Sequence, residues 1–417
     1  MKRAWKIIGI MVVLLVTSGT ALAGSPSEIV FPSYYWGETW NGKFLNELKA
    51  GFEKRYPDVK VKDITVPVPV YYDKLYADMT AGTPPDIAGM QDPEIRQYIE
   101  ADLLEPLDPW LKKAGIKPED FIPAAAMAES KGHIYGVIMQ HNPRALLYNE
   151  RLLKEANVAP PTDLNSFYAA LKTLRDPNKQ LFGFATTAKP GNVNTMYMEI
   201  MPMVAGFGGA FFRNGKPTAT SPETIAALTF HKKIYDEDLI PRGMETSTHR
   251  QMFIQGKIAM YAVGPFLAGG VAIGNPSDMP NLRSMLLPFP GRRTMSITVF
   301  FGIPKRAAHK EEAANFLMMM LEEQWQKREV EIIKASPARK GMVDQRFLRE
   351  NPWFAAFAES SSFADSYAPQ GAEAYAPEVI KIVTSHIESM LFRGTDAMRA
   401  CEEMQAELEK LVASKRR

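Results

Sequence analysis

The segment of residues 132–167, GHIYGVIMQHNPRALLYNERLLKEANVAPPTDLNSF, most constrains how this chain can fold. Apolar runs at 134–139 and 144–148 predict two short strands. The segment between them, His141-Asn142-Pro143, is polar and has no periodicity, so we interpret it as a crossover. The chain is therefore expected to leave one structural unit here and enter another.

The second half of the same segment predicts helices. Apolar residues recur at helical spacing until the Pro160-Pro161 break, at Leu152, Leu153 and Ala156. We expect Thr162 to cap the next helix, which carries Phe167, Leu171 and Leu174. A new α/β unit is thus predicted to begin after Pro161.

The first 23 residues have the pattern of an export signal. Basic residues precede an apolar run at 7–16, and Ala21-Leu22-Ala23 forms an A-x-A site, which predicts cleavage after Ala23. The alternative is a membrane anchor, but ten apolar residues fall short of the roughly 20 that a spanning helix needs. No cysteine lies nearby for lipid attachment, so we expect a protein free in the periplasm.

Size, cysteine content and charge limit the class of protein. Removing 23 of 417 residues leaves 394, which favours two domains of about 200 residues each. The single Cys401 excludes an intrachain disulfide, and its helical register with apolar neighbours predicts a buried residue and not a reactive thiol. Without the three signal basic residues, 46 basic residues face 47 acidic ones. This balance gives no sign of nucleic-acid binding.

Strand and helix patterns alternate along the chain, which predicts an α/β fold. Glu28–Tyr34 and Val59–Val66 read as strands on either side of a helix that Pro57 ends, a unit typical of a largely parallel sheet. Further strands are expected at 86–90, 183–187, 258–263, 286–290 and 298–304. Further helices are expected at 72–81, 196–207, 222–235 with Ser221 as the cap, 311–320 and 377–411.

Several short motifs occur in an order that resembles a known family. They are G-x-x-Y-G, L-x-Y-N and P-P-T within 132–162, FEKRYPDVKVK at 52–62, A-G-x-x-P-D-I at 81–87, LEPLDPWL at 104–111, F-x-x-G-K-x-A-M and G-P-F within 253–266, A-A-N-F-L at 313–317 and SPARKGM at 336–342. Together they resemble the extracellular solute-binding proteins of ABC importers, in particular the sugar-binding group that includes maltose-binding protein.

The resemblance implies a two-lobe periplasmic-binding-protein fold of the α/β class. Each lobe would be a mostly parallel sheet flanked by helices, with hinge crossovers between the lobes. We expect residues 24–141 with 302–342 to form the N-terminal lobe. Residues 142–301 with 343–417 would form the C-terminal lobe.

Motifs for catalysis, phosphate binding or metal binding are missing from the sequence. It contains no G-x-x-x-x-G-K-[ST], G-x-S-x-G or H-E-x-x-H string. His133 and His141 are too far apart in sequence to favour a metal site, and no cofactor is predicted. A glycan-active enzyme stays open as an alternative because Asp92 and Glu94 lie near the presumed cleft and could form a carboxylate pair.

Ligand-binding residues are expected where strands end, because ligands of open α/β sheets lie outside the carboxyl ends of the strands. Sugars combine apolar faces with hydroxyl rims, so aromatic, amide, carboxylate and guanidinium groups suit them. For the aromatic residues the alternative is core packing, and Arg144 could instead pair with a buried acid. The predicted ligand-binding residues are Tyr35, Trp36, Glu38, Gln91, Asp92, Asn142, Arg144, Gly264, Phe266 and Phe300.

The sequence thus predicts the periplasmic substrate-binding component of an ABC importer, which captures a carbohydrate between two lobes and has no reaction of its own. Its partners would be that carbohydrate and, transiently, the transmembrane permease subunits, and it would act as a monomer. The alternative is a binding protein for a small charged solute, such as a polyamine, a glycerol phosphate or ferric ion. Closure would be a hinge motion that ligand contacts favour.

Overall fold

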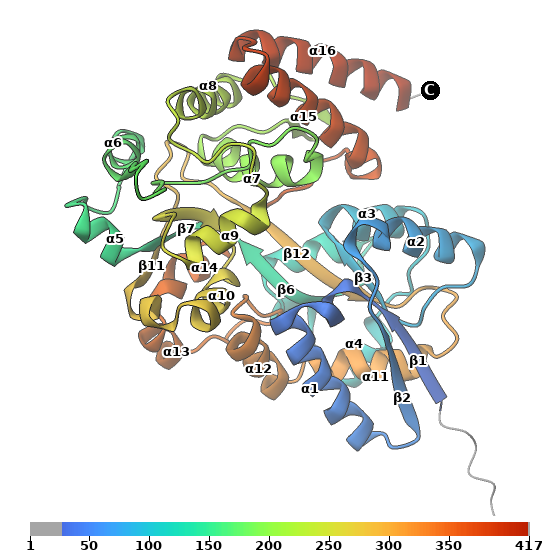
Figure 1. Cartoon of the computed structure of the whole chain (residues 1–417). Coiled ribbons are helices and arrows are strands. Elements are labelled where there is room, and N and C mark those ends of the chain that lie inside the picture. The colour runs from blue at the N-terminus through green and yellow to red at the C-terminus, as the bar shows by residue number, and fades with distance from the viewer. Residues whose placement is uncertain (1–26, 416–417) are drawn as a thin grey trace, which may run out of the picture.

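The computed structural model describes residues 27–415, apart from the side chains of residues 68 and 69 (Figure 1). The predicted export signal lies outside the described residues. The chain forms two lobes, the first with one hydrophobic core and the second with two. No helix within residues 27–415 combines the length and the apolar character needed to cross a membrane.

The first lobe begins with a strand, a helix and a strand in parallel pairing, as predicted. Strands β1 (Ser27–Pro32) and β2 (Val59–Ile64) flank α1 (Thr39–Arg55). Phe44, Leu48 and Phe52 of α1 are fully buried in the core of this lobe. Its other elements are α2 (Val68–Ala81), β3 (Ala88–Gln91), α3 (Asp92–Glu100), α4 (Asp108–Lys113), β4 (Glu129–Ser130), β5 (His133–Ile134), α11 (Lys310–Met320) and α12 (Glu323–Ile333).

The second lobe is built around a three-stranded sheet covered by helices. Strand β7 (Ala145–Asn149) lies between β10 (Met260–Val263) and β11 (Leu282–Met285), and both pairings are antiparallel. The helices are α5 (Glu150–Glu155), α6 (Leu164–Leu174), α7 (Val193–Gly206), α8 (Pro222–Asp236), α9 (Thr246–Ile254), α10 (Leu267–Gly274), α13 (Gln345–Glu350), α14 (Ala355–Ser360), α15 (Ala376–Phe392) and α16 (Ala397–Lys415). The short strands are β8 (Phe212–Arg213), β9 (Lys216–Pro217) and β13 (Asp365–Ser366).

Two long strands carry the chain from one lobe to the other. β6 (Val137–Pro143) and β12 (Met295–Gly302) pair antiparallel and run side by side between the halves of the molecule (Figure 1). Along β12, Met295 and Ile297 belong to the second-lobe core, whereas Phe300 and Phe301 belong to the first-lobe core. The change of core within one continuous strand marks the place where the lobes join.

A third crossing lies against the other two at His141. The His141 backbone N–H donates to the Ser336 carbonyl at 3.0 Å, and the reverse hydrogen bond has the same length. The His141 ring Nδ1 lies 3.0 Å from Thr298 Oγ1 on β12. Burial lowers the pKa of His141 to about 3, so its ring is neutral at physiological pH.

Strand pairing differs from the mostly parallel sheets that were predicted. Parallel pairing is found for β1 with β2 and for β12 with β13, whereas β12 pairs antiparallel with both β3 and β6. The physical reason is the hinge: β6 leaves the first lobe and β12 returns to it, so the two run in opposite directions.

Four local predictions were wrong. Residues 183–187 and 286–290 are not strands, whereas the crossover predicted at His141-Asn142-Pro143 is found, as part of β6. The cap of α6 is Asp163 and not Thr162, because the Asp163 carboxylate accepts the Ser166 N–H at 2.8 Å. The tail forms two helices, since Gly394 breaks it with a φ of 76°. Cys401 is fully buried on α16, as predicted.

Candidate functional site

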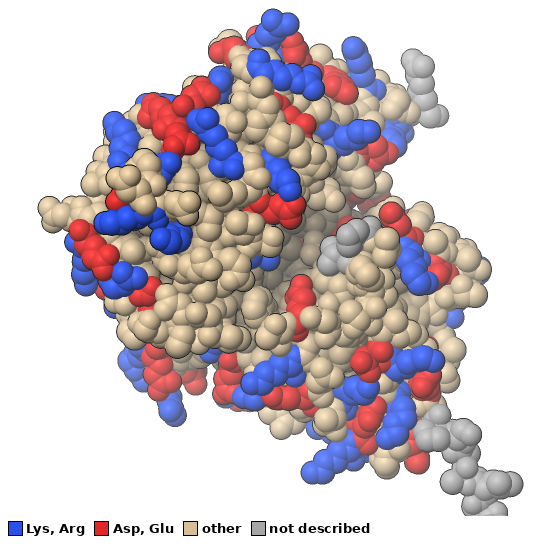
Figure 2. Space-filling model, viewed as in Figure 1, with Lys and Arg blue, Asp and Glu red and all other residues tan. Residues whose placement is uncertain are grey.

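A cavity of about 150 Å³ lies where the two lobes face each other. The space-filling view shows the surface hollowed between the lobes (Figure 2). Residues of the first lobe, the second lobe and both hinge strands line the cavity. They are Tyr34, Tyr35, Glu38, Trp40, Asn41, Gln91, Gln140, Asn142, Arg144, Met198, Arg250, Phe266, Ile297 and Val299.

The first-lobe wall comes from the short turn after β1 and the start of α1. Ser33 caps the turn Tyr34–Gly37 by accepting the Tyr35 N–H, which holds both tyrosines against the core. The Tyr34 hydroxyl lies 2.8 Å from the Tyr35 hydroxyl and accepts from Gln91 Nε2 at 3.1 Å. Burial raises the pKa of both tyrosines above the ordinary value, so they are neutral hydrogen-bonding groups.

The second-lobe wall brings two guanidinium groups to the turn that contains Gly264 and Phe266. Arg250 lies 5.0 Å from the centre of the Phe266 ring. Arg144 lies against Gly264, where an added Cβ would stand 2.6 Å from Arg144 Nη1. Glycine at 264 therefore makes room for the Arg144 side chain at the end of β10.

Aromatic and polar contacts connect the lobes across the cavity. Trp40 of the first lobe and Phe266 of the second are stacked, with ring centroids 6.5 Å apart and an interplanar angle of 24°. The Tyr367 hydroxyl, from the second lobe, donates to Gln91 Oε1 at 3.0 Å. These contacts place two aromatic rings and an amide at the junction.

Five buried polar atoms that belong to cavity-lining residues have no hydrogen-bond partner within residues 27–415. They are the side-chain atoms Asn41 Oδ1, Gln140 Oε1, Asn142 Oδ1, Arg144 Nη1 and Arg250 Nε. A buried polar group without a partner costs about 1–3 kcal/mol. Several such atoms around one cavity indicate that a ligand supplies the partners.

Six of the ten residues predicted to bind ligand line this cavity: Tyr35, Glu38, Gln91, Asn142, Arg144 and Phe266. Gly264 lies behind it, against the Arg144 guanidinium. The other three do not line the cavity.

Trp36, Phe300 and Asp92 are buried away from the cavity, which corrects their predicted position. Trp36 is 7% exposed, packs edge to face on Phe31, and donates its Nε1–H to the Phe31 carbonyl at 2.9 Å. Phe300 is fully buried in the first-lobe core. Asp92 is 1% exposed and accepts the Thr298 N–H at 2.7 Å, and burial raises its pKa to about 7.

Several residues of the cavity wall were not predicted from the sequence. Tyr34 and Trp40 flank the predicted cluster at 35–38 and could have been found from their place after β1. Arg250 lies on helix α9 and is not close in sequence to the end of any predicted strand. Its place in the cavity wall depends on how α9 packs against β10. The remaining missed residues are Asn41, Gln140, Met198, Ile297 and Val299.

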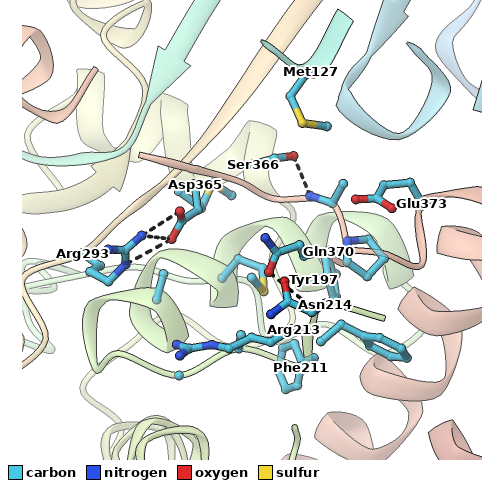
Figure 3. Close-up of a pocket in the computed structure, with 18 residues that line it drawn as sticks. Met127, Tyr197, Phe211, Arg213, Asn214, Arg293, Asp365, Ser366, Gln370 and Glu373 are labelled. Atoms are coloured by element: carbon cyan, nitrogen blue, oxygen red, sulfur yellow. Dashed lines mark hydrogen bonds and ion pairs between the residues drawn. The ribbon is translucent and has the colours of Figure 1, made fainter. Parts of the chain in front are cut away.

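A second, larger cavity of about 500 Å³ lies nearby, lined mostly by the second lobe together with Met127 (Figure 3). Two pairs of its polar lining residues are bonded to each other: Arg293 forms an ion pair with Asp365 at 2.6 Å, and the Asn214 backbone N–H donates to Gln370 Oε1 at 3.4 Å. No lining residue of this cavity is among the described residues with a buried, unpartnered polar side-chain atom, so the smaller cavity is the stronger candidate for a binding site. Among the described residues, no group of three or more His, Cys, Asp or Glu could hold a metal ion.

Comparison with known proteins gives consistent matches. The sequence profile described as bacterial extracellular solute-binding protein matches residues 36–327. A binding protein of Brucella abortus is 24% identical over 368 residues, which cover 85% of this chain and 86% of the relative. The galactooligosaccharide-binding protein of Bacillus subtilis is 24% identical over 370 residues, 84% of this chain and 82% of the relative. The acarbose-binding GacH receptor of Streptomyces glaucescens superposes with a TM-score of 0.81 at 19% identity, covering 93% of this chain and 98% of the receptor.

Proposed function

Because this chain belongs to the bacterial extracellular solute-binding protein family, we propose that it captures a carbohydrate between its lobes for an ABC importer. The observation that carries the proposal is the cavity between the lobes, where unpaired polar atoms surround a pair of aromatic rings. Aromatic faces suit the C–H faces of a sugar, and the unpaired amide and guanidinium groups suit its hydroxyls. The relatives named for sugars support the same ligand class.

In this proposal the protein releases its ligand unchanged to the transmembrane permease and acts as a monomer in the periplasm. The lobes comprise residues up to 141 with 302–342, and residues 142–301 with 343 onward. The core clusters support these boundaries except at residues 299–301, since residues 29–139 and 299–338 share one core. Asp92 and Glu94, the carboxylates of the enzyme alternative, do not line the cavity, so they give that alternative no support.

A thermal-shift screen of the mature protein against neutral sugars, sugar acids, sugar phosphates, polyols and polyamines tests the proposal. A ligand at 100 times its dissociation constant stabilises the folded state by about 2.7 kcal/mol, which such a screen detects. We expect a carbohydrate to raise the melting temperature and to be recovered unchanged by chromatography. Stabilisation by polyamines alone, or conversion of the sugar into a product, would contradict the proposal.

A further inference from the structure

The cavity between the lobes is lined by two arginine side chains that form no ion pair with any described acid. Within residues 27–415, neither Arg144 nor Arg250 makes a side-chain hydrogen bond or an ion pair. Arg144 is 8% exposed, and its Nη1 is fully buried and lies at the cavity wall. A buried guanidinium normally has a carboxylate or phosphate partner, because an unpaired buried charge is costly.

The acids near these arginines do not fill that role. Glu199 is engaged elsewhere: its carboxylate accepts from the Tyr261 hydroxyl and, at 2.7 Å, from the Thr187 hydroxyl. Glu38 is the one carboxylate in the cavity wall, and it accepts from Asn41 Nδ2. Burial raises its pKa, and the charge of Arg250 is near enough to oppose that rise, but the two side chains form no ion pair within residues 27–415. Two guanidinium groups and one carboxylate leave the wall with an excess of positive charge.

The position of the two arginines is fixed by the fold. Arg144 follows the hinge strand β6 and directly precedes β7, and its guanidinium occupies the space that Gly264 leaves open. Arg250 lies on α9 over the Phe266 ring. Burial, and after it the nearby charge of Arg250, lower the pKa of Arg144 to about 10, so the two guanidinium groups are close enough to repel each other unless an anion lies between them.

We propose that the carbohydrate bound here carries an anionic group, a carboxylate or a phosphate, and that Arg144 and Arg250 bind it. This inference rests on the proposed function and narrows its ligand class. Planar guanidinium groups donate two parallel hydrogen bonds to an oxyanion, and these are stronger than bonds to neutral hydroxyls. The Phe266 and Trp40 rings are then left for the apolar face of the sugar.

The test is titration calorimetry of the mature protein with matched triplets, such as glucose, glucuronate and glucose 6-phosphate, and the same three forms of galactose. We expect one anionic sugar to bind at least about tenfold more tightly than the corresponding neutral sugar. Comparing the two anionic members of a triplet shows whether the site prefers a carboxylate or a phosphate. Neutral sugars that bind as tightly as their anionic twins would overturn the inference and leave the proposed function intact.

Three variants and one control test whether the two arginines cause the preference for the anionic sugar. Arg144→Gln and Arg250→Gln should each lower the affinity for the anionic sugar about tenfold or more, and should change the affinity for the neutral sugar much less. Gly264→Ala keeps both charges but displaces the Arg144 guanidinium and the Phe266 ring, so it should weaken binding of the anionic sugar through both contacts and binding of the neutral sugar through the ring alone. Arg346→Gln removes an equal charge from an exposed ion pair with Glu350 and should change nothing. Equal losses for neutral and anionic sugars would overturn the inference.

Inorganic phosphate provides a readout that does not depend on the sugar chosen. At constant ionic strength, replacing chloride by phosphate should raise the melting temperature of the wild type and of Arg346→Gln more than that of Arg144→Gln or Arg250→Gln. An identical response in all four proteins would overturn the inference. If no carbohydrate binds but phosphate still distinguishes the variants, the anion site stands and the proposed carbohydrate function fails.

Discussion

At the scale of single residues, two tryptophans four positions apart have different environments. Trp36 is hydrogen-bonded and packed inside the first-lobe core, whereas Trp40 faces the cavity and stacks on Phe266 of the other lobe. The turn Tyr34–Gly37 followed by α1 separates them, because the chain changes direction between the two rings. Aromatic residue type alone therefore does not identify the ligand contact.

Substituting these two tryptophans should separate binding from stability. Trp40→Ala is expected to weaken ligand affinity by about 1–3 kcal/mol, because it removes a ring from the cavity wall. Trp36→Ala is expected to lower the free energy of unfolding by about 3–5 kcal/mol, because it leaves a hole in a packed core. Calorimetric titration and ligand-free melting curves of both variants check this. The reverse order of effects would mean that Trp36 contacts the ligand.

The sequence was sufficient to predict cavity-lining residues at or near strand ends, such as Gln91, Asn142 and Phe266. It was insufficient for Trp36 and Phe300, because a run of adjacent aromatics does not reveal which rings turn toward the core. Arg250 could not be predicted either. Its position depends on how α9 packs against β10, which no local pattern reports.

At the scale of elements, strands that cross between lobes are difficult to read from periodicity. His141 and Asn142 are polar yet lie within β6, because this strand passes through the polar junction of the lobes and not through one core. Residues 183–187 are the opposite case, because they have the apolar pattern of a strand but do not form one. Phe182 and Phe184 are buried as a strand would predict, but backbone pairing is limited to contacts such as Ala259 N–H to the Phe182 carbonyl.

Helix α12 contains a fully buried acid, Glu329, and burial raises its pKa well above the ordinary value. Its Oε1 has no hydrogen-bond partner among the described residues, and Gln326 donates to Oε2 at 3.2 Å. Because folding raises this pKa, the native state binds the proton more tightly than the unfolded state. The stability that this proton contributes is therefore fully present below about pH 4.5 and is lost as the pH rises toward the raised value.

Glu329→Gln should remove the loss of stability that the wild type shows as the pH rises. We expect its free energy of unfolding to exceed that of the wild type by about 1–3 kcal/mol at pH 8, and by much less at pH 4. Urea unfolding at the two pH values measures the difference. Glu331→Gln, at an exposed residue paired with Arg328 at 2.8 Å, is the control and should change stability by less than about 1 kcal/mol. A gain that is equal at both pH values would show that charge is not its cause.

At the scale of the whole molecule, the two lobes are joined by the hinge strands, by contacts across the cavity, and by contact between α3 and the turn Glu373–Tyr375. The hinge strands carry the backbone, while the Trp40–Phe266 stack and the Tyr367–Gln91 hydrogen bond cross the cavity. Such an arrangement lets the lobes separate by small changes in β6, β12 and the crossing near Ser336. A ligand that contacts both walls would then favour the closed form.

The Tyr367–Gln91 hydrogen bond provides a direct test of this coupling. Tyr367 belongs to the second-lobe core and Gln91 ends β3 of the first lobe, so the bond exists only while the lobes are close. A hydrogen bond of this kind contributes about 0.5–1.5 kcal/mol, which is enough to change an open-to-closed ratio severalfold. Tyr367→Phe should therefore increase the radius of gyration of the ligand-free protein, measured by small-angle scattering, and saturating ligand should restore the compact value. The matched control is Tyr168→Phe, which removes a hydroxyl bonded to Glu237 within one lobe and should leave the radius unchanged. If Tyr367→Phe and the wild type have the same radius with and without ligand, the lobes do not move as the hinge strands suggest, and binding must occur without closure.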